Sequence, residues 1–120
     1  IVDMHAEATS EKLAFARYLD GKVSAVIGTH THIPTADAQI LPEGTAYQTD
    51  VGMVGPVDSV IGMKVEASIN RFLTQRRVKF QQSEDDAFLF QAVLLEIDGD
   101  GRAQHIERID KRMTIERTRI

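Results

Sequence analysis

The chain has 120 residues, of which 42% are hydrophobic and 27% charged, and its formal net charge is -4. This length allows at most one domain with a core of its own, and the composition is that of an ordinary globular protein. The negative charge argues against binding of nucleic-acid polymers, because phosphate binding needs clustered Lys and Arg. The absence of cysteine excludes disulfides and fits a cytoplasmic protein. No apolar run approaches the roughly 18 residues of a membrane helix.

The spacing of apolar residues predicts alternating strands and helices in the first two thirds of the chain. Strands are expected at residues 1–5, 23–27 and 46–49, and helices at about 9–19 and 64–75. Thr9 and Ser10 are natural N-cap residues for the first helix. The second helix has an apolar face at helical spacing, formed by Val65, Ile69, Phe72 and Leu73. This order of elements predicts an α/β protein with a layered sheet.

Beyond residue 77 the pattern changes to that of antiparallel strands. Val78 and Phe80 alternate with polar residues, residues 88–97 form a long apolar run, and residues 103–109 alternate again. The turn between the two longer segments is predicted by Asp98-Gly99-Asp100-Gly101. We expect one domain over residues 1–110. Residues 111–120 are rich in charge and are expected to form a loose tail, or a strand that needs a partner.

The candidate functional residues are three histidines at expected strand ends. His30 and His32 directly follow the strand at 23–27, and His5 ends the opening strand. Strand ends are where α/β proteins build their sites, and neutral imidazole binds first-row transition metals. The spacing is compatible with two metal ions about 3.5–4 Å apart, with one zinc ion, or with ordinary surface histidines. The fourth histidine, His105, lies in the expected hairpin and is assigned to the surface.

Several polar residues and glycines near these histidines allow two interpretations. Asp3 lies on the same strand face as His5, where it could orient the imidazole or be an ordinary polar strand residue. Glu7 also flanks His5 and could belong to the site or be a carboxylate at a helix entry, and the two interpretations are about evenly supported. Asp50 is interpreted as a turn cap rather than a site residue. Gly52 and Gly55 bracket a loop whose amides could approach a phosphate, but a plain turn with positive φ is favoured.

Three stretches of the sequence resemble the YmdB-like family of bacterial calcineurin-like metallophosphoesterases, which act as cyclic-nucleotide phosphodiesterases. These stretches are residues 2–12, 23–32 and 44–56, and the resemblance extends to about residue 109. The resemblance implies an α/β fold that is part of a four-layer α/β/β/α metallophosphoesterase sandwich. It also implies a centre of two metal ions, iron or manganese, at the strand ends.

The histidines match the ligand motifs of this family. The run Gly28-Thr29-His30-Thr31-His32 matches its closing G-x-H-x-H motif, and His5 matches an isolated histidine ligand upstream. By this resemblance, His5 and His30 would bind one metal ion and His32 the other. The metal ions would activate a hydroxide for in-line attack on phosphorus.

The chain departs from the family pattern in what it lacks. The family pattern also has an N-terminal aspartate, a bridging Glu-Asn pair and an Asn-His step whose histidine is the general acid. The single asparagine here, Asn70, is followed by Arg71, so neither step is present. Because the chain also begins without methionine, inside an expected strand, we interpret it as the C-terminal half of such an enzyme. It would supply three histidine ligands but no catalytic residue, and would be inactive alone.

The expected substrate of the full-length enzyme is a cyclic nucleotide, of the 2′,3′-cAMP type. Neither a membrane nor a nucleic-acid polymer is expected as a partner. A half-sandwich exposes sheet surface and unpaired strand edges, so a homo-oligomer is expected. The alternative from another functional class is a non-catalytic module for metal binding or protein interaction.

Overall fold

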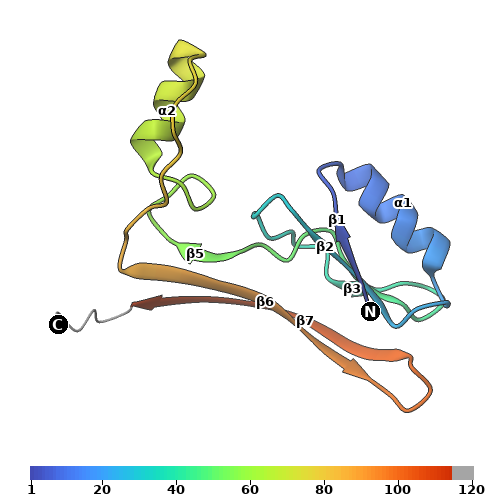
Figure 1. Ribbon diagram of the computed structural model, residues 1–120. Coiled ribbons are helices and arrows are strands. Elements are labelled where there is room, and N and C mark those ends of the chain that lie inside the picture. Colours follow the sequence, from blue (N-terminus) through green and yellow to red (C-terminus); the bar gives the residue numbers. More distant parts are fainter. Residues whose placement is uncertain (115–120) are drawn as a thin grey trace. The chain divides into compact units, whose positions relative to one another are not determined.

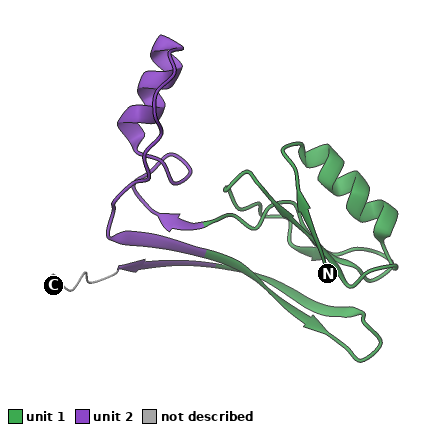
Figure 2. Cartoon of the chain, viewed as in Figure 1, with its two compact units in different colours: residues 1–53, 91–109 green, residues 54–90, 110–120 purple. Residues whose placement is uncertain are grey.

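The computed structural model describes residues 1–114 (Figure 1). Its elements in chain order are β1 (Val2–His5), α1 (Thr9–Leu19), β2 (Ala25–Thr29), β3 (Gln39–Ile40), β4 (Ala46–Gln48), β5 (Val54–Pro56), α2 (Val65–Thr74), β6 (Ala87–Ile97) and β7 (Ala103–Thr114). They divide into two compact units (Figure 2). Unit 1 contains Ile1–Met53 and Gln91–Ile109, and unit 2 contains Val54–Phe90 and the chain from Asp110 onward.

The centre of unit 1 is a four-stranded sheet in the order β1-β2-β4-β3. The strands β1, β2 and β4 are parallel, and β3 pairs antiparallel with β4. Helix α1 connects β1 to β2, since parallel neighbours need a crossover. The register pairs Val2 with Val26 and His5 with Thr29. The carboxyl ends of β1 and β2 therefore lie side by side, which is the position from which both histidine segments emerge.

Each face of this sheet is covered by a different layer of unit 1. On one face Val26 packs with Ala16 of α1, and with Leu41 and Tyr47. The alternate residues of β2 point to the opposite face, because successive side chains of a strand alternate. There they pack against the hairpin of β6 and β7 in a cluster of Ala25, Ile27, Ala46 and Ala103, with Val51, Val93, Leu95 and Ile106 around it. Unit 1 thus consists of a helix, a mostly parallel sheet and an antiparallel hairpin, which confirms the mixed α/β prediction (Figure 1).

Unit 2 consists of β5, α2 and the adjoining parts of β6 and β7. Strand β5 pairs antiparallel with the start of β6, with Val54 opposite Phe90. Helix α2 forms where its apolar spacing predicted it, but its apolar face is not buried in the described structure. Ile69 is 51% exposed, Phe72 80% and Leu73 79%. The spacing identified the helix correctly, but spacing does not reveal what covers its apolar face.

Several predicted boundaries need correction. The strand expected at 23–27 lies at 25–29, because β2 continues alongside β1 as far as His5. Ala8, rather than Thr9 or Ser10, is the N-cap of α1, and no side chain caps that end. Residues 78–80 form no strand, whereas β3 and β5 were not predicted.

At the C-terminal end, β7 runs through Thr114, so the boundary expected at residue 110 falls within a strand. Residues 111–114 follow the second alternative, a strand with a partner. The rest of the expected charged tail, residues 115–120, lies outside the described residues. Neither helix in the described part of the chain is long and apolar enough to cross a membrane.

Candidate metal site

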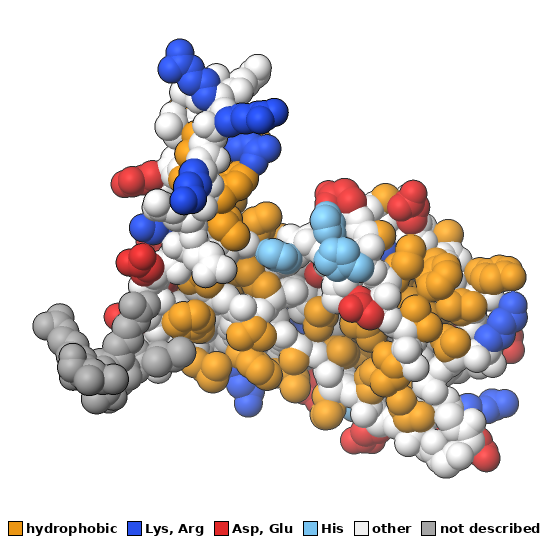
Figure 3. Space-filling view, in the orientation of Figure 1, with side chains coloured by type: hydrophobic (Ala, Val, Ile, Leu, Met, Phe, Trp, Pro, Cys, Tyr) orange, Lys and Arg blue, Asp and Glu red, His pale blue; other side chains and the backbone are white. Residues whose placement is uncertain are grey.

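Two of the three predicted ligands meet at the carboxyl ends of β1 and β2. Nε2 of His5 lies 3.2 Å from Nδ1 of His30. The two rings are edge to face, with their centroids 4.9 Å apart. Both side chains are exposed, and Figure 3 shows histidines gathered on one open face of the molecule. The prediction that these strand ends bring histidines together is therefore correct for this pair.

The orientation of His5 is fixed by a hydrogen-bond chain from Asp3. The Thr29 hydroxyl donates to Oδ1 of Asp3 at 2.6 Å and lies 3.0 Å from Nδ1 of His5. Because the hydroxyl has a single proton, its oxygen accepts the Nδ1–H of His5. Nε2 of His5 is then the nitrogen with a free lone pair, and it faces His30. Asp3 does orient the imidazole, but acts through Thr29, which the sequence did not single out.

His30 has a carboxylate on its other ring nitrogen. Its Nε2 lies 2.9 Å from Oε2 of Glu7, in a pair whose side chains are 43% and 81% exposed. An ion pair this open to solvent contributes little to stability. Its geometry is nevertheless that of metal-bound histidines, which donate their second N–H to a carboxylate or another polar acceptor. Glu7 is therefore a contact of the histidine pair as well as a residue at the entry of α1.

The backbone of the histidine loop is held in an uncommon conformation. His30 has a φ of 106° and His32 a φ of 65°. Residues with a Cβ rarely adopt such angles, which cost on the order of 1–3 kcal/mol each and cluster at functional sites. Two such residues on either side of Thr31 indicate that the surrounding structure determines the path of this loop.

A buried ion pair beneath the loop fixes the path of its backbone. Nζ of Lys12 lies 2.8 Å from Oδ2 of Asp50, and both side chains are at most 1% exposed. Burial by itself would raise the pKa of Asp50, but hydrogen bonds from Lys12, Gly52 and Thr31 outweigh it and hold that pKa below its ordinary value. Asp50 is thus a charged support of the histidine loop, in addition to the turn cap that the sequence predicted.

Sequence reasoning missed Lys12 altogether. The available signal was its position on the buried side of α1, one helical turn before the fully buried Ala16. A lysine on an apolar helix face needs a buried partner, since lysine is almost never fully buried alone. Asp50 was visible as a carboxylate after a strand, but nothing local connected it to a residue 38 positions away.

His32, the third predicted ligand, follows in the same loop, with its own backbone at a φ of 65°. Among residues 1–114, no three His, Asp or Glu side chains are arranged to hold a metal ion. The assignment of His32 as a metal ligand stays a prediction, and a complete ligand set needs donors beyond the described residues. His105 is exposed on β7 beside Glu107, as predicted.

The amides of the glycine loop are used within the chain itself. Gly52 has a φ of 91° and donates its N–H to Asp50. The N–H of Met53 is accepted by Oε1 of Gln91. Gly55 lies in β5, paired with Leu89. The favoured interpretation, a turn with positive φ, is confirmed for Gly52 and is wrong for Gly55.

The histidine pair fits the binding of one cation. Two imidazoles on one metal, with bonds of about 2.0–2.1 Å and an angle near 100–110°, place their nitrogens about 3.1–3.4 Å apart. The observed 3.2 Å between Nε2 of His5 and Nδ1 of His30 falls in this range. Two nitrogens are only half of a four-coordinate shell, so further ligands are needed for tight binding.

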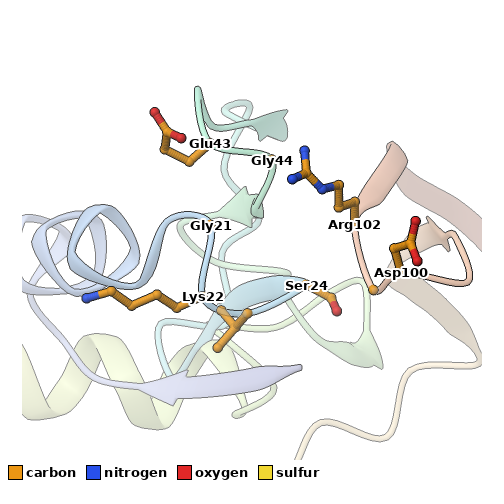
Figure 4. A pocket seen from close by; sticks show the side chains of 9 residues that line it. Gly21, Lys22, Ser24, Glu43, Gly44, Asp100 and Arg102 are labelled. Carbon is orange, nitrogen blue, oxygen red and sulfur yellow. The ribbon is translucent and has the colours of Figure 1, made fainter.

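A separate groove in unit 1 lies at the opposite end of β2. Its volume is about 400 Å³, and it is lined by three loops that include Lys22, Glu43, Asp100 and Arg102 (Figure 4). Two of these side chains are cationic and two anionic, so the groove favours neither sign of charge. It contains no histidine and is not part of the candidate metal site.

Comparison with known proteins agrees with the sequence motifs. The family model described as YmdB-like protein matches residues 1–109. A 2′,3′-cyclic-nucleotide 2′-phosphodiesterase of Bacillus subtilis is 54% identical over 108 residues, covering 90% of this chain and 41% of the relative. A putative phosphatase/phosphodiesterase of Mycoplasma pneumoniae is 52% identical over 99 residues, covering 82% of this chain and 35% of the relative.

Solved structures agree as well. A hypothetical protein from Thermus thermophilus is 51% identical with a TM-score of 0.86, covering 92% of this chain and 43% of that chain. A novel phosphatase from Mycoplasma pneumoniae is 44% identical with a TM-score of 0.87, covering 95% of this chain and 41% of that chain. The chain thus spans about two fifths of the length of the relatives that it matches. It belongs to the YmdB-like family.

Proposed function

We propose that this chain is the histidine-bearing part of a metal-dependent phosphodiesterase that hydrolyses 2′,3′-cyclic nucleotides. The observation that carries the proposal is the 3.2 Å separation between Nε2 of His5 and Nδ1 of His30, which suits one shared cation. The names of its relatives, a cyclic-nucleotide phosphodiesterase and a phosphatase/phosphodiesterase, support the reaction class.

In this proposal His5 and His30 bind one metal ion and His32 a second, with iron or manganese in both positions. Bound metal ions supply a nucleophilic hydroxide at neutral pH and stabilise charge on the phosphoryl oxygens. The chain's own residues set the ligand geometry. Thr29 and Asp3 keep Nε2 of His5 free for coordination, and Glu7 accepts the second N–H of His30.

The remaining ligands and the general acid belong to the rest of the family fold. The helix, sheet and hairpin of unit 1 would be half of a four-layer α/β/β/α sandwich. A domain over residues 1–110 would contribute this half, and the charged segment from residue 111 on begins as the continuation of β7. The assembled enzyme would be a cytoplasmic homo-oligomer that binds neither membranes nor nucleic-acid polymers.

A ligand substitution in a full-length enzyme carrying this chain tests the proposal. His30→Ala should lower kcat/KM for 2′,3′-cyclic AMP at least about 100-fold and reduce the bound manganese or iron, since even residues around the ligands affect metal affinity about 10–100-fold. The matched control is His105→Ala, an exposed histidine on β7, which should retain both. Full activity and metal content in His30→Ala would refute the proposal.

The 120-residue chain itself should show negligible hydrolysis of the same substrate under the same conditions. Without carboxylate ligands and a general acid, three imidazoles cannot hold a dinuclear centre. Turnover by the chain alone near that of the full-length enzyme would contradict this.

One observation favours the alternative, a non-catalytic interaction module. The apolar face of α2 is open in the described structure, as expected of a surface that binds another protein. A module of this kind would bind its partner without any metal-dependent turnover in the full-length protein. The His30→Ala comparison therefore also separates these two functions.

A further inference from the structure

The Lys12–Asp50 ion pair lies between elements that are distant in sequence. Lys12 is in the first half of α1, and Asp50 follows β4. Both side chains are removed from water. Taking two charges out of water is costly, and a well-packed apolar pair of similar volume often stabilises a fold equally well or better. Fold stability by itself therefore does not explain why a charged pair occupies this place.

The ion pair forms hydrogen bonds with the backbone on both sides of His30. Nζ of Lys12 donates to the carbonyl oxygen of Thr29 at 2.7 Å. Oδ2 of Asp50 accepts the N–H of Thr31 at 3.0 Å. Hydrogen bonds to charged groups are stronger than neutral ones, so both peptide groups beside His30 are firmly oriented. These are the peptide groups that set the φ of 106° at His30.

Two further features adapt the chain to this pair. A Cβ at Gly28 would lie 3.0 Å from Cδ of Lys12 and in direct collision with the carbonyl of Thr49, so glycine leaves the path of the lysine stem open. Oδ1 of Asp50 accepts the N–H of Gly52 at 3.0 Å, which fixes the carboxylate from its other side. The carboxylate thus has a defined orientation toward the histidine loop.

We propose that Lys12 and Asp50 are positioning residues, which hold the histidine loop so that Nδ1 of His30 faces Nε2 of His5 and the two share one cation. This inference rests on the proposed metal-binding function of that histidine pair. Neither residue contacts the cation. Each acts through the backbone of Thr29 or Thr31.

The double substitution Lys12→Met/Asp50→Asn tests this role, because it removes both charges with little change of volume. The measurements on a full-length enzyme carrying this chain, freed of metal, are circular dichroism for the fold, and titration with Co(II) by calorimetry and visible absorption for the site. We expect a folded protein whose Co(II) affinity is about 10–100-fold lower, the range for residues that orient metal ligands. The amide of Thr31 should also exchange faster with solvent.

The matched control is Lys64→Met/Glu84→Leu, which removes an exposed ion pair with an N···O distance of 3.9 Å in unit 2. It should bind Co(II) as the parent does. If the first double variant does not fold, Asp50→Asn alone is judged by the same criterion. If neither folds, the pair serves folding, and the positioning role is refuted.

The outcomes separate this inference from the proposed function. A folded Lys12→Met/Asp50→Asn variant that binds Co(II) within twofold of the parent overturns the positioning role and leaves the metal site standing. If the parent binds no Co(II), or binds it equally well after His5→Ala/His30→Ala, the metal site is refuted together with the positioning role.

Discussion

Thr29 ends β2 at the point where strand geometry passes into the histidine loop. Its hydroxyl donates to the carboxylate of Asp3 and accepts the Nδ1–H of His5, so Asp3 orients the ring of His5 through this hydroxyl. This arrangement determines which nitrogen of His5 is free, and with it the direction from which a cation is bound.

Replacing Thr29 by Val should weaken Co(II) binding about tenfold, because the isosteric methyl group leaves Nδ1 of His5 without its acceptor. Thr29→Ser keeps the hydroxyl and should bind nearly as the parent does. Calorimetric titration of both variants measures the difference. Equal affinities for Val and Ser would show that the hydroxyl does not orient the ring.

Gly28 illustrates a steric requirement of the same strand. A Cβ there would stand 1.6 Å from the carbonyl oxygen of Thr49, a collision that requires movement of β2 against β4. Gly28→Ala should therefore destabilise the protein by about 3 kcal/mol or more, at the upper end of overpacking effects. Gly99→Ala, at an open position, should change the stability by no more than about 0.5 kcal/mol. Urea unfolding of both variants measures the contrast.

At the scale of elements, α2 ends on a residue that is not suited to its position. Gln75 caps the helix in the left-handed region, with a φ of 55°, and donates its N–H to the carbonyl of Arg71. Glycine is the usual residue at such a cap because it lacks the Cβ that opposes this conformation.

Gln75→Gly should therefore stabilise α2 by about 1 kcal/mol. Thr74→Gly, one residue earlier and inside the helix, should destabilise it by a similar amount, since glycine costs about 0.5–1 kcal/mol there. Amide hydrogen exchange within α2 reports local stability for both variants. Slower exchange in Thr74→Gly than in Gln75→Gly would contradict the assigned cap.

The missed elements were short. β3 has two residues and β5 three, and a two-residue alternation is not recognisable in so few positions. Both exist because a neighbouring strand offers backbone partners, β4 for the first and β6 for the second. Long patterned segments such as β6 were identified from the sequence because eleven residues of apolar character need no such context.

For the whole molecule, four aspartates whose pKa values are lowered link stability to pH: Asp37, Asp50, Asp85 and Asp98. Burial would raise the pKa of Asp37, but hydrogen bonds from Thr35 and Thr49 outweigh it, so this pKa lies below its ordinary value of 3.8, as does that of Asp50. The folded state then binds fewer protons than the unfolded state near that pH. The stabilisation is present above about pH 4 and is lost as the pH falls below it.

We expect the free energy of unfolding to fall steadily from pH 5 to pH 3, and Asp37→Asn to flatten this dependence by removing one of these groups. Urea unfolding at a series of pH values measures the slope. A slope in Asp37→Asn identical to that of the parent would show that the hydrogen bonds of Asp37 do not couple folding to protonation.

The open apolar face of α2 makes a prediction about association. Phe72→Ser/Leu73→Ser should shift the chain toward the monomer in light scattering coupled to size exclusion, because contiguous exposed apolar surface favours association. Ala67→Ser, a substitution in the same helix outside this pair, is the control. A parent chain that is monomeric at high concentration would refute the predicted homo-oligomer for this part of the protein.

The sequence by itself determined the family, the alternation of helices and strands, the hairpin turn at Asp98-Gly99-Asp100-Gly101 and the placement of His5 and His30 at neighbouring strand ends. These features follow from local patterns or from motifs that are contiguous in the chain. The family assignment is confirmed by the match over residues 1–109.

Only the tertiary structure decided which histidines meet and what holds them. Lys12 lies in α1, Thr29 ends β2 and Asp50 follows β4. Their contacts arise from the packing of α1 on the parallel strands β1, β2 and β4. The positive φ angles of His30 and His32 are likewise not specified by a local pattern of residues. Contacts between residues far apart in the chain exist only once the sheet has formed, so no local pattern of residues reveals them.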